Sequence, residues 1–430
     1  MHSADETWSP PQYDLSKPPL LDSTLSINPD VILEHNFPRT AKWCPDGSAL
    51  LAHCENRTFQ LFANYSEGPR QISAVNEFPQ AGPILDFVWF PTATPHDPAS
   101  FCFVASVREC PVKLLDASDG RLRASYRIVD HRERQIAPHS LAFNLTAQKL
   151  YCGFEDAIEV FDVSRPGEGV RLHTTPSKKS RDGLKGIISA LAFSPSYSPE
   201  ECFYAAGSFN PTSCNIAMFS DAAPDPILFL DGGPGAGVTQ LQFNPLRPHI
   251  LYASYRGSAS DCIYSWDVRS NVDEPLEIFK KSSTIGSEPR SNQKIRFDVD
   301  ITGRYLSVGD HMGFISVFEL ESGEGGISSN AVPETDAPGP KMHTAKLHFK
   351  AHSDSVGSVA FHPLKPSLLS ASGSRHFTEI GQSDSSGTES DEESALSRAK
   401  QAQRSTKRPQ PVTFDSTIKM WDFNFRSLCQ

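Results

Sequence analysis

The chain has 430 residues, of which 38% are hydrophobic and 10% aromatic, and its formal net charge at pH 7 is −11. This composition supplies ample material for a large core in one domain. No apolar run of about 18 residues occurs and the Pro-rich N-terminus lacks a secretion signal, so an intracellular protein without a membrane span is expected. The acidic balance argues against indiscriminate nucleic-acid binding, because it repels phosphate at long range.

From residue 40 onwards, one pattern recurs along the chain. It comprises an alternating apolar strand, a turn, a second strand that ends in Ser or Gly, and a third strand that closes on an aromatic residue and an acid. Copies lie at 40–62, 84–116, 139–162, 187–221, 238–269, 294–320 and 356–374 with 416–422, and outer fourth strands at 121–129, 170–175, 226–232, 275–280 and 345–350. Such short strands cannot bury both faces alone. The sequence therefore predicts an all-β fold, a single seven-bladed WD-repeat β-propeller.

Segments outside the repeats suggest the boundaries of this domain. Residues 1–29 are rich in Pro, Ser and acid, which predicts a disordered tail. Residues 30–35, DVILEH, alternate like a strand, and we assign them to complete the last blade so that the ring has no exposed edge. The propeller then spans 30–423 and is followed by a tail at 424–430.

Two further segments interrupt the repeats. Residues 321–343 are expected to form a long loop before the sixth outer strand. Residues 376–414 are an insert in the seventh blade, with an acidic half at 383–394 and a basic half at 397–408. A polar segment with segregated charge has no apolar face to bury, which predicts disorder.

The motifs of the chain do not indicate an enzyme. GGPGAG at 232–237 lacks the Lys-Ser/Thr and the helix of a phosphate loop, and no nucleophile elbow or metalloprotease motif occurs. None of the nine cysteines forms a C-x-x-C, so reduced thiols are expected, with no metal and no cofactor. Four residues of the seventh blade could suggest a catalytic triad but occupy the places where WD repeats use a structural hydrogen-bond network: His352, Ser372, Asp415 and Trp421. Trp266 and Asp261 are expected to repeat part of this network in the fifth blade.

Charged loops suggest a binding face. In a propeller, the loops from an outer strand to the next inner strand share one face with the loops between the second and third strands. On that face we place the basic residues Arg57, Arg108, His131, Arg132, Arg134, Lys178, Lys179, Arg181, Lys185, Arg256, Lys280, Lys281, Arg290 and Lys294, with Phe154, Phe209, Tyr255 and Phe377 among them as rings that could stack on bases. Simple solvation of long polar loops would give the same pattern, so charge alone leaves both interpretations open.

Several phrases resemble the telomerase Cajal body protein family. They include AKWCPDGS (41–48), LYCGFEDAIEVFDVSRPG (150–167), IRFDVDITGRYLSVG (295–309) and LLSASGSRHF (368–377), within a resemblance that covers roughly 37–377 and 416–423 in the same order. The chain departs from the family pattern at 143–148, where FNLTAQ replaces the usual PDG turn, and in its short N-terminal tail.

The resemblance implies a non-catalytic RNA-binding propeller that recognises a loop motif, the CAB box, in box H/ACA small Cajal body RNAs and telomerase RNA. It further implies a role in telomerase assembly and trafficking, and a nuclear, Cajal body location with a possible cytoplasmic pool. The partners it implies are those RNAs, telomerase and H/ACA ribonucleoprotein proteins, and the cytosolic chaperonin for folding of a monomer. The alternative is a WD-repeat scaffold that binds only protein peptides through the same face.

The acidic half of the insert also suggests regulation. Ser383, Ser385, Ser386, Thr388 and Ser390 lie among acidic residues, a setting typical of substrates of acid-directed kinases. Each phosphate would add about −1.5 to −2 charges. Phosphorylation is therefore predicted to compete with RNA for the basic face and to favour its release.

Overall fold

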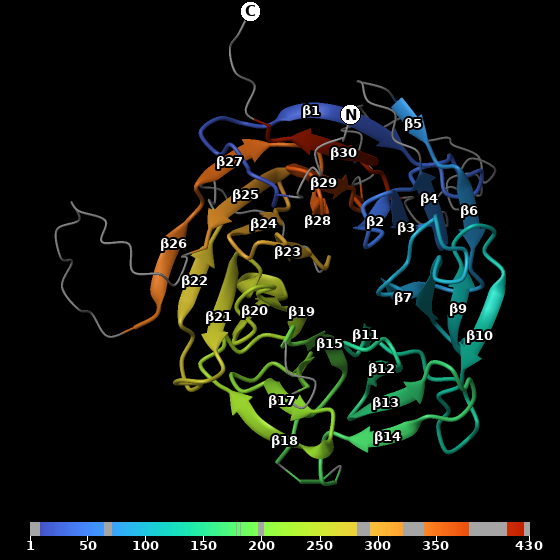
Figure 1. Cartoon of the computed structure of the whole chain (residues 1–430), viewed down its shortest axis with the longest axis vertical. Helices are drawn as coiled ribbons and strands as arrows, with labels where there is room; N and C mark the ends of the chain where they lie inside the picture. Colours follow the sequence, from blue (N-terminus) through green and yellow to red (C-terminus); the bar gives the residue numbers. More distant parts are fainter. Residues whose placement is uncertain are drawn as a thin grey trace, which may run out of the picture.

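The computed structural model describes residues 9–63, 71–177, 179–180, 182–196, 202–281, 293–320, 339–377 and 411–424. Within these ranges the chain forms strands and one short 3-10 helix, Gly257–Ala259. The described part contains no helix that is long and apolar enough to cross a membrane. Seven sheets surround a central axis (Figure 1). The predicted seven-bladed β-propeller is confirmed.

Each of the first four blades has four antiparallel strands, which are named here from the axis outwards. Blade 1 contains β2 (Pro38–Trp43), β3 (Ala49–Cys54), β4 (Thr58–Ala63) and β6 (Asn76–Pro79). Blade 2 contains β7 (Ile84–Trp89), β8 (Cys102–Val107), β9 (Val112–Asp116) and β10 (Leu122–Tyr126). Blade 3 contains β11 (Ser140–Phe143), β12 (Lys149–Phe154), β13 (Ala157–Asp162) and β14 (Val170–His173), and blade 4 contains β15 (Ile188–Phe193), β16 (Phe203–Ser208), β17 (Ile216–Ser220) and β18 (Ala223–Leu230).

Two of the last three blades carry a fifth strand that pairs in parallel on the outer edge. Blade 5 contains β19 (Val238–Phe243), β20 (Ile250–Tyr255), β21 (Cys262–Asp267), β22 (Glu277–Lys280) and the added β26 (Lys341–Thr344). Blade 6 contains β23 (Phe297–Val299), β24 (Tyr305–Gly309), β25 (Phe314–Glu319) and β27 (Leu347–Lys350). Blade 7 contains β28 (Val356–Phe361), β29 (Ser367–Ser372), β30 (Thr417–Asp422), β1 (Leu20–Ser26) and the added β5 (Gln71–Ser73).

The core lies between blades rather than within them. Strands β3, β8 and β20 are buried along their whole length, because a neighbouring blade covers each face. Between blades 1 and 2, the ring of Phe59 lies 5.3 Å from that of Phe87 and 5.0 Å from that of Phe103, measured between centroids. Stacking of adjacent blades thus buries the apolar faces that a single blade would expose.

The strand that closes the ring differs from the sequence assignment. Strand β1 pairs antiparallel with β30, and Leu25 opposite Ile418 is fully buried. Assigning residues 30–35 to this position was wrong, because they form a turn in which the Asp30 carboxylate accepts the backbone N–H groups of Ile32 and Leu33 at 2.7 and 2.8 Å. The propeller therefore begins before residue 30. Residues 1–8 and 425–430 lie outside the described residues.

The N-terminal segment before β1 also packs on the ring. Tyr13 is buried between blades 6 and 7, where its ring meets Tyr305, Phe361 and Phe423 edge-on at centroid distances of 5.4, 5.2 and 5.7 Å. The backbone N–H of Asp14 donates to the carbonyl of Phe423 at 3.0 Å. The ring is therefore closed by β1 and additionally clasped by the segment before it.

The two predicted interruptions are described only at their ends. Residues 321–338 of the expected loop lie outside the described residues, and its last residues belong to β26. For the insert, residues 378–410 lie outside the described residues. Its flanks meet directly, because His376 and Val412 exchange backbone hydrogen bonds of 2.8 and 2.7 Å.

Candidate functional site

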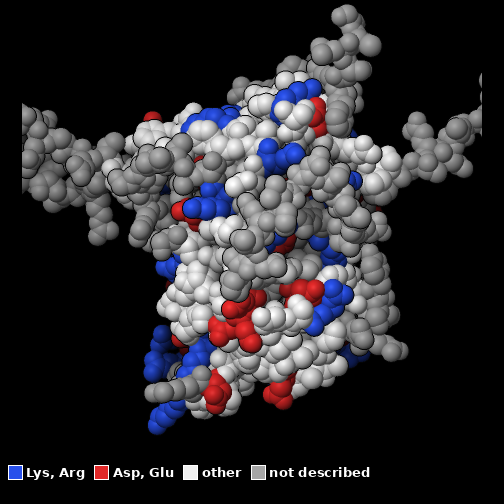
Figure 2. Space-filling view, turned by 90° about the vertical axis from the view of Figure 1, so that its left-hand side faces the viewer, with Lys and Arg blue, Asp and Glu red and all other residues white. Residues whose placement is uncertain are grey.

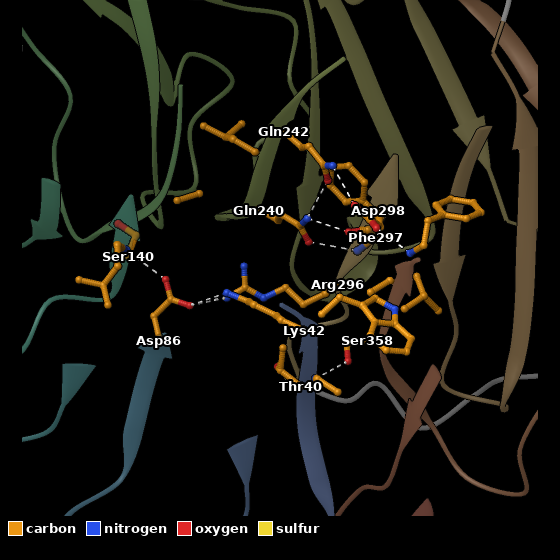
Figure 3. A pocket seen from close by; sticks show the side chains of 18 of the residues that line it. Thr40, Lys42, Asp86, Ser140, Gln240, Gln242, Arg296, Phe297, Asp298 and Ser358 are labelled. Carbon is orange, nitrogen blue, oxygen red and sulfur yellow. Dashed lines mark hydrogen bonds and ion pairs between the residues drawn. The ribbon is translucent and has the colours of Figure 1, made fainter. Parts of the chain in front are cut away.

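A channel of about 420 Å³ follows the propeller axis, lined by the innermost strands of the blades. Within the channel, Asp86 of β7 forms ion pairs with two cations. Its Oδ1 lies 3.6 Å from Nζ of Lys42 on β2 and 3.5 Å from Nη2 of Arg296, which precedes β23. Its Oδ2 accepts the backbone N–H of Leu141 at 3.0 Å. Figure 3 shows this carboxylate turned toward both cations. One acid thus connects blades 1, 2, 3 and 6 across the channel.

The ionisation of Asp86 follows from these neighbours. Burial alone would raise the pKa of its carboxyl, but Lys42 and Arg296 outweigh burial and hold that pKa below its usual range. On the other wall, the amide of Gln242 donates to Oδ1 of Asp298 at 2.9 Å and the backbone N–H of Phe361 donates to Oδ2 at 2.8 Å. Burial nevertheless raises the pKa of Asp298 to about 6. The two channel acids therefore differ in how firmly they hold their charge.

At one end the channel opens into a depression of about 720 Å³, which we call the channel mouth. It lies on the face formed by the outer-to-inner loops and the second-to-third-strand loops. Its lining includes five cationic residues, Arg39, Arg256, Lys294, Arg296 and Arg375, and several rings, among them Phe209 and Phe377. Asp86, already shared by Lys42 and Arg296, is the single acidic residue among the described residues that line it. The channel mouth is therefore strongly cationic in a chain whose net charge is −11.

Two of these cations lie over the ring of Phe209. The Arg256 guanidinium lies 5.4 Å and the Lys294 ammonium 5.0 Å from its ring centroid. Neither cation has an ion-pair partner among the residues that the structure describes. Burial, with the nearby charge of Arg296, lowers the pKa of Lys294 to about 8. Both groups are therefore available to an anion from outside, and Phe377, with 62% of its surface exposed, offers an open ring beside them.

Arg39 and Arg375 are held differently. Both guanidinium groups form ion pairs with Glu55, whose side chain is only 4% exposed in the turn between β3 and β4. Of the six cations in the channel and its mouth, Lys42 and Arg296 pair with Asp86, and Arg39 and Arg375 pair with Glu55. By contrast, the outer wall beside β22 and β26 shows Lys and Arg interspersed with Asp and Glu (Figure 2). This outer wall therefore lacks the positive excess of the mouth.

The structure brings some of the sequence-predicted residues together and separates others. Arg256, Lys294, Phe209 and Phe377 line the channel mouth, whereas Arg57 and Arg108 line a neighbouring cleft. The remaining described cations are at loops of the same face but line neither cavity: His131, Arg132, Arg134 and Lys179 are exposed, Lys185 is half-buried, and Lys280 is exposed at the end of β22. Lys178, Arg181, Arg290 and the phosphorylation candidates Ser383, Ser385, Ser386, Thr388 and Ser390 lie outside the described residues.

Three of the predicted surface residues are buried, which corrects their assignment. Phe154 and Tyr255 are 4% and 2% exposed, because each ends a second strand that neighbouring elements cover on both faces. Arg171 lies over the Phe154 ring, 5.1 Å from its centroid. Lys281 is 6% exposed, and burial lowers its pKa to about 8. None of the three presents its side chain to a ligand on the surface.

Sequence reasoning missed Arg39, Lys42, Arg296 and Arg375. Lys42 lies within an inner strand, and Arg39 and Arg296 lie at or before the start of one, where the side chains meet the axial channel rather than solvent. A cation inside an alternating inner strand, as in PRTAKW and KIRFDV, was the available signal. A charge on a buried strand needs a partner or a ligand.

The hydrogen-bond network of the seventh blade uses a different serine from the one expected. His352 Nδ1 lies 3.0 Å from Asp415 Oδ2, and its Nε2 lies 2.8 Å from Oγ of Ser370, which also accepts the Trp421 indole N–H at 2.8 Å. The assignment of Ser372 was wrong: its hydroxyl donates to the carbonyl of Ser355 at 3.2 Å.

The fifth blade does not repeat this network, which corrects a second expectation. The indole N–H of Trp266 donates to the backbone carbonyl of Asp231 at 3.0 Å. The backbone carbonyl of Asp261 accepts the N–H of Lys281 at 3.0 Å. Trp266 is fully buried, so its role in packing is independent of Asp261.

Comparison with known proteins identifies the relatives of this chain. No protein-family model matches it. Telomerase Cajal body protein 1 of Bos taurus is 32% identical over 397 residues, which are 90% of this chain and 66% of the relative. That of Homo sapiens is 31% identical over 362 residues, which are 82% of this chain and 60% of the relative. This chain belongs to the telomerase Cajal body protein family. The resemblance seen in the sequence is thereby confirmed.

More distant relatives extend this comparison. The telomerase Cajal body protein 1 homolog of Drosophila melanogaster is 25% identical over 401 residues, 90% of this chain and 65% of the relative. A protein of Schizosaccharomyces pombe named guanine nucleotide-binding protein negative regulator 1 is 29% identical over 289 residues, 64% of this chain and 68% of the relative. The chain spans between 59% and 66% of the length of the mammalian family members.

Proposed function

We propose that this member of the telomerase Cajal body protein family is a non-catalytic RNA-binding propeller whose channel mouth binds a short unpaired RNA segment. The observation that supports this most directly is the cationic mouth, where Arg256 and Lys294 lack ion-pair partners among the described residues and flank Phe209. Phosphate groups bind such cations, and bases that are not stacked in a duplex bind aromatic rings. The CAB box loop of box H/ACA small Cajal body RNAs and of telomerase RNA is the ligand that we infer.

The concave shape of the mouth favours a loop over a duplex. Sequence-specific recognition of RNA targets single-stranded loops, because the major groove of an A-form helix is too narrow for side chains to read. In the arrangement that we propose, Arg256 and Lys294 bind consecutive phosphates. The exposed ring of Phe377 stacks on a base. Asp86 keeps Lys42 and Arg296 engaged within the channel, so that they add to the positive potential without leaving their blades.

The names of the relatives suggest where this binding operates. We infer that the chain supports assembly and trafficking of telomerase, and that it resides in nuclear Cajal bodies with a cytoplasmic pool. Its partners would be telomerase RNA, small Cajal body RNAs, and the protein components of telomerase and H/ACA particles. Folding by the cytosolic chaperonin and a monomeric state complete the proposal.

Binding of a short labelled single-stranded RNA, followed by fluorescence anisotropy, tests the site. The double variant Arg256→Ala/Lys294→Ala is expected to bind more weakly. Its negative slope of log affinity against log salt should be shallower by about 1.4, since each lost contact to a single strand removes about 0.7. Because the pKa of Lys294 is about 8, wild-type affinity should fall as pH rises through 8 and the ammonium loses its proton. A base-paired RNA of the same length should bind less well.

The matched control is Arg304→Ala, an exposed arginine between β23 and β24 on the opposite face. If Arg304→Ala weakens binding as much as the double variant, the channel mouth is not the RNA site. Sequencing of RNA crosslinked to the protein in cells identifies the ligand, and a loop motif shared by the recovered RNAs is the expected result. Recovery of no enriched RNA would favour the alternative, a scaffold that binds only proteins.

A further inference from the structure

A second depression lies beside the channel mouth on the same face of blades 1 and 2. It has a volume of about 750 Å³ and lies between the turn that joins β3 to β4 and the residues that lead into β7. Its lining combines two exposed arginines with aliphatic side chains: Arg57, Arg108, Ile32, Leu33, Pro83 and Leu85. We call it the arginine cleft. Arg39 and Arg375, both paired with Glu55, line the arginine cleft as well as the channel mouth, so the two depressions adjoin at these residues.

The carboxylates of the arginine cleft are already engaged. Glu55 is paired with two arginines, and Asp30 accepts the side-chain amide of Asn56 at 2.8 Å as well as two backbone N–H groups of its own turn. Arg57 and Arg108 therefore have no acidic partner among the residues that the structure describes. Arg57 is also held at a fixed place, because its backbone adopts φ of 67° in the turn and its carbonyl accepts the N–H of Gln80 at 2.9 Å.

An apolar tip stands at the edge of the same cleft. Val31 and Ile32 are 102% and 95% exposed, although they are large aliphatic residues. The Asp30 turn keeps them there, and its bond to Asn56 fixes the turn against the β3–β4 connection. Exposed aliphatic residues that are held in place by hydrogen bonds are typical of a surface that binds another protein.

The chemistry of the lining distinguishes between a peptide and RNA. Among the described residues that line the cleft, the only ring is the imidazole of His53, and burial lowers its pKa to about 3, so it is neutral. Bases stack best on aromatic rings, whereas aliphatic side chains pack well against other aliphatic side chains. The two unpaired guanidinium groups match carboxylates in bidentate geometry.

We propose that the arginine cleft binds an acidic segment of a partner protein that carries an aliphatic side chain. Its carboxylates would pair with Arg57 and Arg108, and its aliphatic side chain would pack against Ile32, Leu33 and Leu85. This interaction is separate from RNA binding in the channel mouth and does not depend on it. A propeller with both sites joins an RNA to a protein on one face.

Fluorescence anisotropy with three labelled decapeptides tests the proposal on the full chain. One contains Glu and Leu, the second Glu and Ser, and the third Lys and Leu. The Glu/Leu peptide is expected to bind most tightly. Arg57→Ala/Arg108→Ala should weaken its binding about tenfold or more, because two charge pairs are lost, and Ile32→Ser should reduce its advantage over the Glu/Ser peptide. All variants lie on the surface, and a thermal melt establishes that they fold.

Two controls separate this site from the RNA site. Arg304→Ala on the opposite face should leave peptide binding unchanged, and so should Arg256→Ala/Lys294→Ala. Unchanged binding of the Glu/Leu peptide by the Arg57/Arg108 double variant would overturn the proposal. It would also be overturned if that variant lost single-stranded RNA as strongly as the channel-mouth variant, because the cleft would then extend the RNA site. Loss of RNA binding alone in the channel-mouth variant leaves the peptide site standing.

Discussion

Replacement of Ser370 by alanine should strongly destabilise the propeller. The Ser370 hydroxyl connects two buried groups in the last blade: it accepts the indole N–H of Trp421 and donates to Nε2 of His352, both at 2.8 Å. His352 can accept that bond because burial lowers its pKa, which keeps the ring neutral, with its proton on the Nδ1 that faces Asp415. Loss of one hydroxyl therefore leaves a buried donor and a buried acceptor unsatisfied.

The expected magnitude follows from the number of groups left without partners. A buried polar group that loses its hydrogen bond costs about 1–3 kcal/mol. Because Ser370→Ala leaves two such groups, it should lower the free energy of unfolding by about 3 kcal/mol or more. Ser370 is fully buried, so water cannot replace the hydroxyl without a rearrangement of the blade. The network joins β29 to β30 and to His352 in the segment before β28, in the blade that β1 closes by pairing with β30. Its loss should therefore lower the free energy of unfolding of the whole ring.

Ser372→Ala is the matched control. Ser372 lies on the same strand, is equally buried, and loses the same atom. Its hydroxyl makes a single bond, to the carbonyl of Ser355 at 3.2 Å, and a carbonyl has a second lone pair that remains usable. The expected loss is about 1 kcal/mol.

Urea unfolding followed by circular dichroism compares the two variants with the wild type. The midpoint for Ser370→Ala should shift to clearly lower urea than that for Ser372→Ala, with similar slopes. Equal shifts, or a larger shift for Ser372→Ala, would refute the assignment of Ser370 to the network. A loss of RNA binding by folded Ser370→Ala, without a loss of stability, would place this network in the binding site instead.

Two further outcomes are expected from the way in which the chain closes on itself. Tyr13→Ala should lower the free energy of unfolding by about 3 kcal/mol in urea titrations, because it removes a buried ring that contacts three aromatic neighbours. Tyr13→Phe should lower it much less, since the Tyr13 hydroxyl has no hydrogen-bond partner among the described residues. Deletion of residues 378–410 should leave a folded ring and change stability by only about a kcal/mol, because His376 and Val412 already pair and loop closure depends weakly on length. If the deletion variant melts without a cooperative transition, this prediction for the insert is wrong.

Much of the fold could be predicted because local sequence patterns determine it. Period-2 alternation and turn residues recur at a spacing that each blade repeats, so the number of blades and the positions of most strands follow from short windows of sequence. The face on which the long basic loops lie also follows, since it depends only on which strands a loop connects. Arg256, Lys294, Phe209 and Phe377 were placed on this face in this way, and they line the channel mouth.

Tertiary structure decided the features that depend on contacts between residues far apart in the chain. Segments 20–26 and 30–35 both alternate, and only pairing with β30 shows that the first closes the ring. Ser370 and Ser372 are two positions apart on one strand, and the location of His352 and Trp421 selects between them.

The burial of side chains at the ends of strands also depends on contacts with distant parts of the chain. Tyr255 ends a second strand, and whether it meets solvent depends on the blade beside it, which covers it. Arg39 and Arg296 lie at the starts of inner strands in blades 1 and 6, and they meet at the channel mouth because the ring brings their strands to one axis. A local pattern reports the period of a strand, whereas the environment of each side chain is set by the neighbouring blades, which come from distant parts of the sequence.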